Sequence, residues 1–216
     1  TVLGDIFAHS SSEPTIAESI ADELDDVPQP FSEESIQGST PYLDACIYET
    51  IRMHPPVGHI YARAKVDLNI RGLHVAKDSN VTAHTWYTLR DPRFWKNPDL
   101  FDPDRFMPPR NEHLIPERPF VAFGSGDVDD GRACPGREIA LLAIKSAVIN
   151  AIGGYEWQLR KPAWDDHRYR ERYGVPNFED GMRVEGFSRK RRALSTEELA
   201  TFDGSEEERP IYLAIS

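Results

Sequence analysis

Residues 41–56, PYLDACIYETIRMHPP, constrain the fold more than any other stretch of the sequence. Apolar residues recur there at every fourth position, at Leu43, Ile47 and Ile51. This periodicity predicts a helix over 41–53 with one buried face. The helix ends before the paired prolines, because proline disfavours helical backbone in the residue that precedes it.

Glu49 and Arg52 lie three positions apart on this helix, so their side chains share a face and can pair. On spacing alone the favoured reading is an exposed ion pair, which contributes little to stability. The alternative is burial, because both residues border the apolar stripe. Arg105, in FDPDRF (101–106), then supplies a third charge, and a buried Glu–Arg–Arg network ties the helix to the later segment through bidentate hydrogen bonds.

The segment over 91–119 contains seven prolines, which exclude regular secondary structure. It also contains large apolar side chains that require burial: Phe94, Trp95, Leu100, Phe101 and Phe106. We therefore expect an ordered, packed coil.

Periodicity and turn-forming residues predict the other elements of the chain. They are a helix over 13–27, a polar connector over 28–40, a small antiparallel sheet over 57–85, a helix over 137–152, and strands over 155–160 and 181–188. We expect one unit over 1–192, mainly α with small β-sheets, followed by an acidic tail over 193–216.

Composition excludes several classes of function. The chain has 216 residues and a formal net charge of −11, and this charge argues against a nucleic-acid partner, since phosphate binding needs clustered Lys and Arg. Two cysteines, Cys46 and Cys134, form no disulfide framework and favour a reducing compartment. No run is apolar and long enough to span a membrane. The sequence lacks an initiator Met, so we expect a fragment or a processed chain.

Cys134 stands in FGSGDVDDGRACPG, residues 123–136, at the predicted start of a helix. Pro135 is favoured in the first helical position, and a helix N-terminus stabilises a thiolate. Three readings follow: an inert buried thiol, an axial thiolate ligand to heme iron, and a nucleophilic cysteine. The third reading requires a histidine base, and the candidates are His59, His84 and His113.

Three motifs in register resemble the cytochrome P-450 family. YETIRMHPP (48–56) is similar to its E-x-x-R helix, FDPDRF to its P-x-R-F segment, and FGSG…GRACPG to its heme loop. TLRDPRFWKNPDLF (88–101) resembles the stretch before the family's meander. The resemblance covers roughly residues 14–187 and implies the C-terminal portion of the cytochrome P-450 fold, a mainly α fold with small sheets.

The resemblance implies a role for each matching residue. Glu49, Arg52 and Arg105 correspond to the structural triad that holds the meander, and Cys134 to the proximal ligand of heme iron. The other matches are heme-binding positions, of which the two arginines would reach the propionates: Phe123, Gly126, Gly136, Arg132 and Arg63. Residues 57–61 would line the distal side, next to the substrate.

Two segments depart from the family pattern. The family has four steps from the loop glycine to the cysteine, whereas Gly126 and Cys134 are eight apart, so DVDD (127–130) is an insertion. The distal helix is at best a remnant over 1–13, with Ser11 or Ser12 near its alcohol position and His9 where glycine is usual.

The implied function is that of a heme-thiolate monooxygenase, which inserts one oxygen atom from O2 into a small apolar substrate. A reductase or ferredoxin would supply the electrons. We expect the chain by itself to bind heme weakly and to be inactive. The alternative is a non-catalytic remnant of the fold that acts as a binding module. An endoplasmic-reticulum location is expected only if an N-terminal anchor precedes this sequence.

Overall fold

A computed structural model describes most of the chain. The described residues are 3, 6, 14–27, 33–126, 129, 133–159, 169–172, 175–178 and 184–189. The predicted distal-helix remnant over 1–13 lies outside them, apart from Leu3 and Ile6, and the predicted tail over 193–216 lies wholly outside them.

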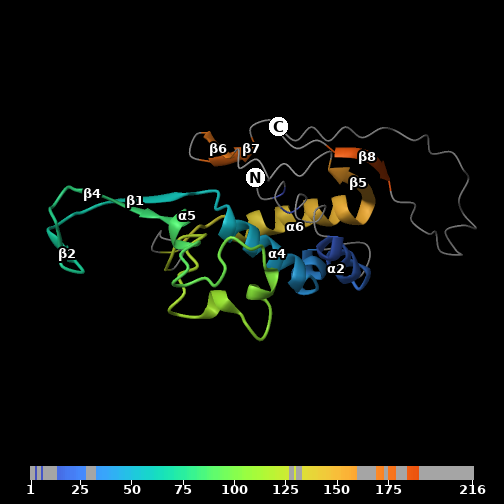
Figure 1. Cartoon of the computed structure of the whole chain (residues 1–216), viewed down its shortest axis with the longest axis horizontal. Coiled ribbons are helices and arrows are strands. Elements are labelled where there is room, and N and C mark those ends of the chain that lie inside the picture. The colour runs from blue at the N-terminus through green and yellow to red at the C-terminus, as the bar shows by residue number, and fades with distance from the viewer. Residues whose placement is uncertain are drawn as a thin grey trace, which may run out of the picture.

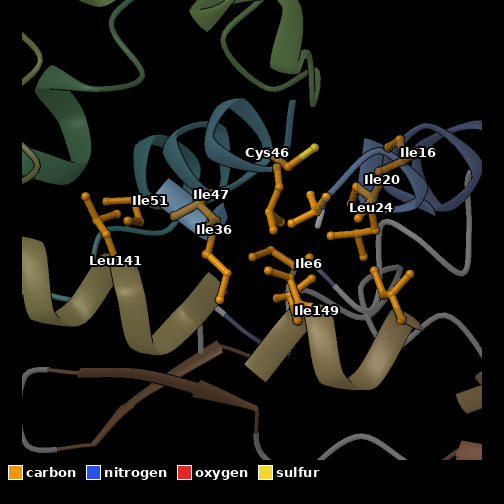
Figure 2. Close-up of a cluster of buried hydrophobic side chains, with 14 of the residues drawn as sticks. Ile6, Ile16, Ile20, Leu24, Ile36, Cys46, Ile47, Ile51, Leu141 and Ile149 are labelled. Carbon is orange, nitrogen blue, oxygen red and sulfur yellow. The ribbon is translucent and has the colours of Figure 1, made fainter. Parts of the chain in front are cut away.

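Three helices pack around the main hydrophobic core, as the apolar periodicity predicts (Figures 1 and 2). They are α2 (Pro14–Asp25), α4 (Pro41–Met53) and α6 (Arg137–Gly154). Ile20, Ile47 and Val148, one from each helix, are fully buried. Burial of such side chains is the main force that holds the three helices together, at roughly 1.5–3 kcal/mol each.

The predicted polar connector over 28–40 contains a short helix, α3 (Glu33–Gly38), which the sequence analysis did not predict. Ile36 explains the difference, because it is 6% exposed and belongs to the main core (Figure 2). Ile36 is the only apolar residue of α3, and a single apolar residue gives no periodic signal, so packing in the folded chain decides the structure there.

The predicted sheet over 57–85 is two separate antiparallel pairs. Strands β1 (His59–Arg63) and β4 (Asn80–His84) pair, and β2 (Leu68–Ile70) and β3 (Leu73–Val75) form a second pair between them in sequence. The short helix α5 (Thr85–Thr88) follows β4 directly. The strands extend away from the helices as an arm (Figure 1).

The coil over 91–119 is ordered and packed, as expected, with two short 3-10 helices, η1 (Pro103–Phe106) and η2 (Glu112–Leu114). Trp95 is fully buried in a second core with Leu89, Ala45 and Phe106. The expectation that Leu100 is buried was wrong, because its side chain is 56% exposed.

The last described strands form two hairpin-like pairs. The predicted strands β5 (Tyr155–Leu159) and β8 (Val184–Arg189) pair with each other, whereas β6 (Tyr169–Arg172) and β7 (Val175–Phe178) were not predicted. The fold is therefore mainly α with small antiparallel sheets, in agreement with the sequence. Within the described residues, no helix is both long enough and apolar enough to cross a membrane.

Candidate functional site

Cys134 lies in a backbone turn just before α6, and its side chain is exposed, so the reading of an inert buried thiol was wrong. Its N–H donates to the carbonyl of Phe123 at 2.8 Å, which closes the loop on itself. Gly124 forms isolated β-bridges with Ala122 and Ala133 and adopts a φ of 82°. A side chain is strained in this left-handed region, so glycine suits the turn.

Gly136 lies next to the sulfur of Cys134. A Cβ atom added at this position would lie 4.0 Å from the Cys134 Sγ atom. Gly136 is also the N-cap residue of α6, which continues for 18 residues. The unpaired N–H groups and the dipole of such a helix favour negative charge near Cys134.

Arg137, the first residue of α6, connects the cysteine loop to α4, and the sequence analysis missed it. Its Nη2 atom donates to the Tyr48 hydroxyl oxygen at 3.1 Å, and its Cζ atom lies 5.3 Å from the centre of the Phe123 ring. The available signal was its position directly after the CPG triplet. The guanidinium group thus links the helix that bears Glu49 to the ring that precedes the cysteine.

Glu49 and Arg52 are both fully buried, so the reading as an exposed ion pair was wrong. Arg52 donates from Nε to Glu49 Oε2 at 2.6 Å and from Nη2 to Oε1 at 2.9 Å. Arg105 adds a bond from Nε to Glu49 Oε1 at 3.3 Å, and its side chain is 1% exposed. The backbone N–H of Asp102 donates to the same oxygen at 2.9 Å.

The two arginines also donate to backbone carbonyl oxygens of the coil and its approach. Arg52 donates to Leu89 O at 2.9 Å and to Pro98 O at 2.7 Å. Arg105 donates to Asn97 O at 2.8 Å. Buried carbonyl groups outside helices and sheets require hydrogen-bond donors. The network supplies these donors to a segment that has no helical or sheet hydrogen bonds at those carbonyl groups.

Glu112 forms a second charged cluster in the coil that the sequence analysis did not identify. It accepts from Arg110 Nη2 at 2.8 Å and forms ion pairs with Arg118 and, at 3.8 Å, with Arg105. Arg105 therefore contacts both clusters and joins α4 to η2.

Of the two proposed propionate-binding arginines, only Arg63 lies within the described residues. Arg63 lies on β1 with an exposed side chain, and its Nε atom donates to the Asp78 carbonyl at 3.2 Å. Arg132 lies outside the described residues, as does most of the insertion over 127–130. Gly126 is described, with a φ of 80°.

The three histidines named as candidate bases have other neighbours. The His59 and His84 rings meet edge to face with centres 4.4 Å apart, and His113 packs on Tyr48 and Phe106. Burial, and secondly the charge of Arg137, lower the pKa of His113. Among the described residues none of the three forms a hydrogen bond with Cys134, so the geometry does not support a cysteine–histidine nucleophile.

Known proteins resemble the chain over about 60% of its length. Drimenol monooxygenase of Persicaria hydropiper is 39% identical over 133 residues, covering 58% of this chain and 24% of its own length. Ferruginol synthase of Salvia fruticosa is 33% identical over 138 residues, covering 63% and 27%. Ferruginol synthase 1 of Rosmarinus officinalis is also 33% identical over 138 residues, with the same coverage. The chain thus spans about a quarter of the length of the curated relatives it matches.

A family model matches residues 1–171, which include the helix with Glu49, the coil with Arg105 and the loop with Cys134. The match covers most of the chain, and the sequence motifs and the helical core agree with it. The chain belongs to the cytochrome P-450 family.

Proposed function

We propose that the chain is the cysteine-bearing part of a heme-thiolate monooxygenase, with Cys134 as the axial ligand of the iron. The observation that carries the proposal is the exposed thiol of Cys134, held at the start of an 18-residue helix by a loop bonded to itself. A free cysteine is usually buried, so an exposed one in an ordered turn points to a chemical role.

The residues around Cys134 fit a large, flat group on the sulfur. A thiolate is a soft anionic ligand of the kind that holds heme iron, and Gly136 places no side chain against it. Phe123 and Gly126 would border the face of the heme that the sulfur binds. Arg63 and Arg132 would pair with the propionate groups, since guanidinium binds carboxylate bidentately. Heme bound in this way supplies the activation of O2, which side chains alone do not.

We assign the Glu49–Arg52–Arg105 network a structural role within the protein, with no direct contact to the heme. It fixes the coil, and the coil leads through residues 120–122, which pack on the second core, directly into the loop of Cys134. The network contacts backbone atoms of the coil and lies within the fold. Its function is therefore to position the loop that carries the ligand.

An apolar organic molecule is the proposed substrate, with a reductase or ferredoxin as electron donor. Three of the five residues proposed to lie beside the substrate carry large apolar or aromatic side chains that are accessible, since Val57 is 57% exposed, Ile60 40% and Tyr61 74%. One relative is named for its action on drimenol and others for the synthesis of ferruginol, which supports small organic substrates for this chain as well.

A carbon monoxide difference spectrum tests the ligand assignment. The full chain is mixed with excess hemin, reduced and exposed to carbon monoxide, next to Cys134→Ala and the matched control Cys46→Ala. We expect the Soret band of thiolate-ligated heme in the parent and in Cys46→Ala, and its loss in Cys134→Ala. A thiolate band that survives in Cys134→Ala, or a parent that shows none, would overturn the proposal.

A further inference from the structure

His59 and His84 form a cross-strand pair at the base of the arm. They are register partners in the antiparallel pairing of β1 and β4, so their side chains project from the same face. The ring centres lie 4.4 Å apart with an angle of 69° between the ring planes. His84 is exposed and His59 is partly exposed, so both can be reached from solvent.

The nitrogen atoms of both rings are available. Among the described residues no protein group forms a hydrogen bond with either imidazole, and each ring instead contacts a tyrosine ring. Tyr61 lies 6.0 Å from His59 and Tyr87 lies 5.5 Å from His84, measured between ring centres. The tyrosines restrict the movement of the imidazoles without occupying their nitrogens.

The backbone beneath the pair is anchored. Thr85 is 2% exposed, its N–H donates to the Gly58 carbonyl at 3.0 Å, and its hydroxyl donates to the Val57 carbonyl. Thr88 Oγ1 donates to the carbonyl of His84 at 2.8 Å. The two histidines therefore project from the part of the arm that is fixed to the body, and such pre-organisation favours ligand binding.

We propose that His59 and His84 form a two-imidazole chelate for a divalent transition-metal ion such as Zn²⁺ or Cu²⁺. Imidazole nitrogen suits both ions, and a bond length of about 2.0–2.1 Å to zinc requires two nitrogens roughly 3.3 Å apart. Rings with centres 4.4 Å apart reach this spacing by a small rotation about their side-chain bonds. Within the described residues no group of three or more His, Cys, Asp or Glu could hold a metal, so water completes the coordination.

This site is separate from the proposed heme ligand. It uses nitrogen ligands on β1 and β4, whereas Cys134 precedes α6. Occupation of the site would cross-link the two strands at their anchored end. It would stabilise the arm because the metal binds the paired strands better than the separated ones.

Metal binding by the full chain tests the proposal, with Zn²⁺ followed by calorimetry and Cu²⁺ by electron paramagnetic resonance. The variants are His59→Ala and His84→Ala, and the matched control is His74→Ala, an exposed histidine on β3 that faces Asn69 across its strand pair. We expect each site variant to lose affinity on the order of 10²-fold, the lower end of the gain from linking two ligands. The control should bind as the parent does, and the copper spectrum of the parent should show coupling to two nitrogens.

A Cys134→Ser variant separates the site from the thiol, and circular dichroism of each variant reports folding. If the Cys134→Ser variant binds the metal as the parent does, the result supports the histidine site. If this variant loses metal binding, the proposal is overturned. Equal affinity in the parent and in folded His59→Ala and His84→Ala would also overturn it. If a variant fails to fold, the nitrogen coupling in the copper spectrum of the parent decides the question.

Discussion

Arg105 and Glu49 lie 56 positions apart in the sequence, yet the Arg105 Nε and Glu49 Oε1 atoms are 3.3 Å apart and both side chains are buried. The same carboxylate accepts two bonds from Arg52. One acid therefore contacts two guanidinium groups away from water. Removal of the acid leaves Arg52 without its buried counter-charge, and leaves Arg105 with only its longer ion pairs to Glu112 and Asp102, at 3.8 Å.

We expect Glu49→Ala to lower the free energy of unfolding by about 3–5 kcal/mol, the loss that follows when one partner of a buried charge pair is removed. Arg52→Ala should have an effect of the same order. Denaturant unfolding followed by circular dichroism measures both changes. Arg93→Ala is the control, since Arg93 pairs with Asp91 through a side chain that is 79% exposed. The Arg93→Ala variant should have nearly the same free energy of unfolding as the parent. If Glu49→Ala also unfolded like the parent, the structural role of the Glu49–Arg52–Arg105 network would be contradicted.

Glu23 on α2 accepts from the N–H groups of Tyr42 and Leu43, at 2.6 and 2.9 Å, at the start of α4. Burial raises the pKa of Glu23 and outweighs these two bonds, which act to lower it. A raised pKa means that folding favours the protonated acid. The stability that Glu23 contributes is therefore fully present below its unfolded-state pKa and is lost as pH rises through its folded-state pKa.

We accordingly expect the stability of the parent relative to Glu23→Gln to decline as pH rises across that window and then to level off. Urea unfolding at a series of pH values measures the difference. Glu18→Gln, an exposed change on the same helix, is the control and should follow the parent. A difference that increases with pH would show that the two backbone bonds outweigh burial.

The two cysteines should react with thiol reagents at very different rates. Cys134 is exposed, whereas Cys46 is 1% exposed and burial raises its pKa. Because the thiolate is the reactive form, we expect iodoacetamide to modify Cys134 in the folded chain and Cys46 only after denaturation. Peptide mass spectrometry identifies the modified residue. Early labelling of Cys46 would place it at the surface and refute the packing described for α4.

Trp95 is fully buried, and its Nε1 atom has no hydrogen-bond partner in the described part of the chain. Trp95→Ala should cost about 3–5 kcal/mol, because it opens a large cavity in the second core. Trp95→Phe removes no hydrogen bond and retains an aromatic ring, so we expect a clearly smaller loss. Thermal unfolding compares the two variants. Equal losses would indicate that the indole nitrogen has a partner that matters for stability.

The helices could be predicted because their apolar residues repeat with the helical period, as Leu43, Ile47 and Ile51 do. The short helix α3 could not, because Ile36 is the only apolar residue in its sequence. The hairpin of β6 and β7 begins with YRER, a charged run that gives no strand signal. Ile36 is buried through contacts distant in sequence, which local patterns do not record, whereas β6 and β7 pair with each other as neighbours in sequence and lack a local strand signal.

The candidate site divides in the same way. Glu49 and Arg52 could be paired from their spacing, and Cys134 stood out because glycines surround it. The burial of the pair and the contacts of Arg137 with Tyr48 and Phe123 depend on how α6 packs on α4, so spacing alone could not reveal them. The heme roles of Arg63 and Arg132 stay predictions.

The guanidinium groups of Arg52 and Arg105 bind the coil through the carbonyl oxygens of Leu89, Asn97 and Pro98. Every residue type carries that oxygen. These contacts therefore depend on the conformation of the backbone and not on which side chains it carries. At residue 98 the shape of the coil is thus compatible with many side chains. At residue 97, with a φ of 48°, a residue that tolerates left-handed backbone is needed. Where the coil is held only through its carbonyl oxygens, it can therefore vary in sequence, whereas the buried side chains of Trp95 and Arg105 fix other positions.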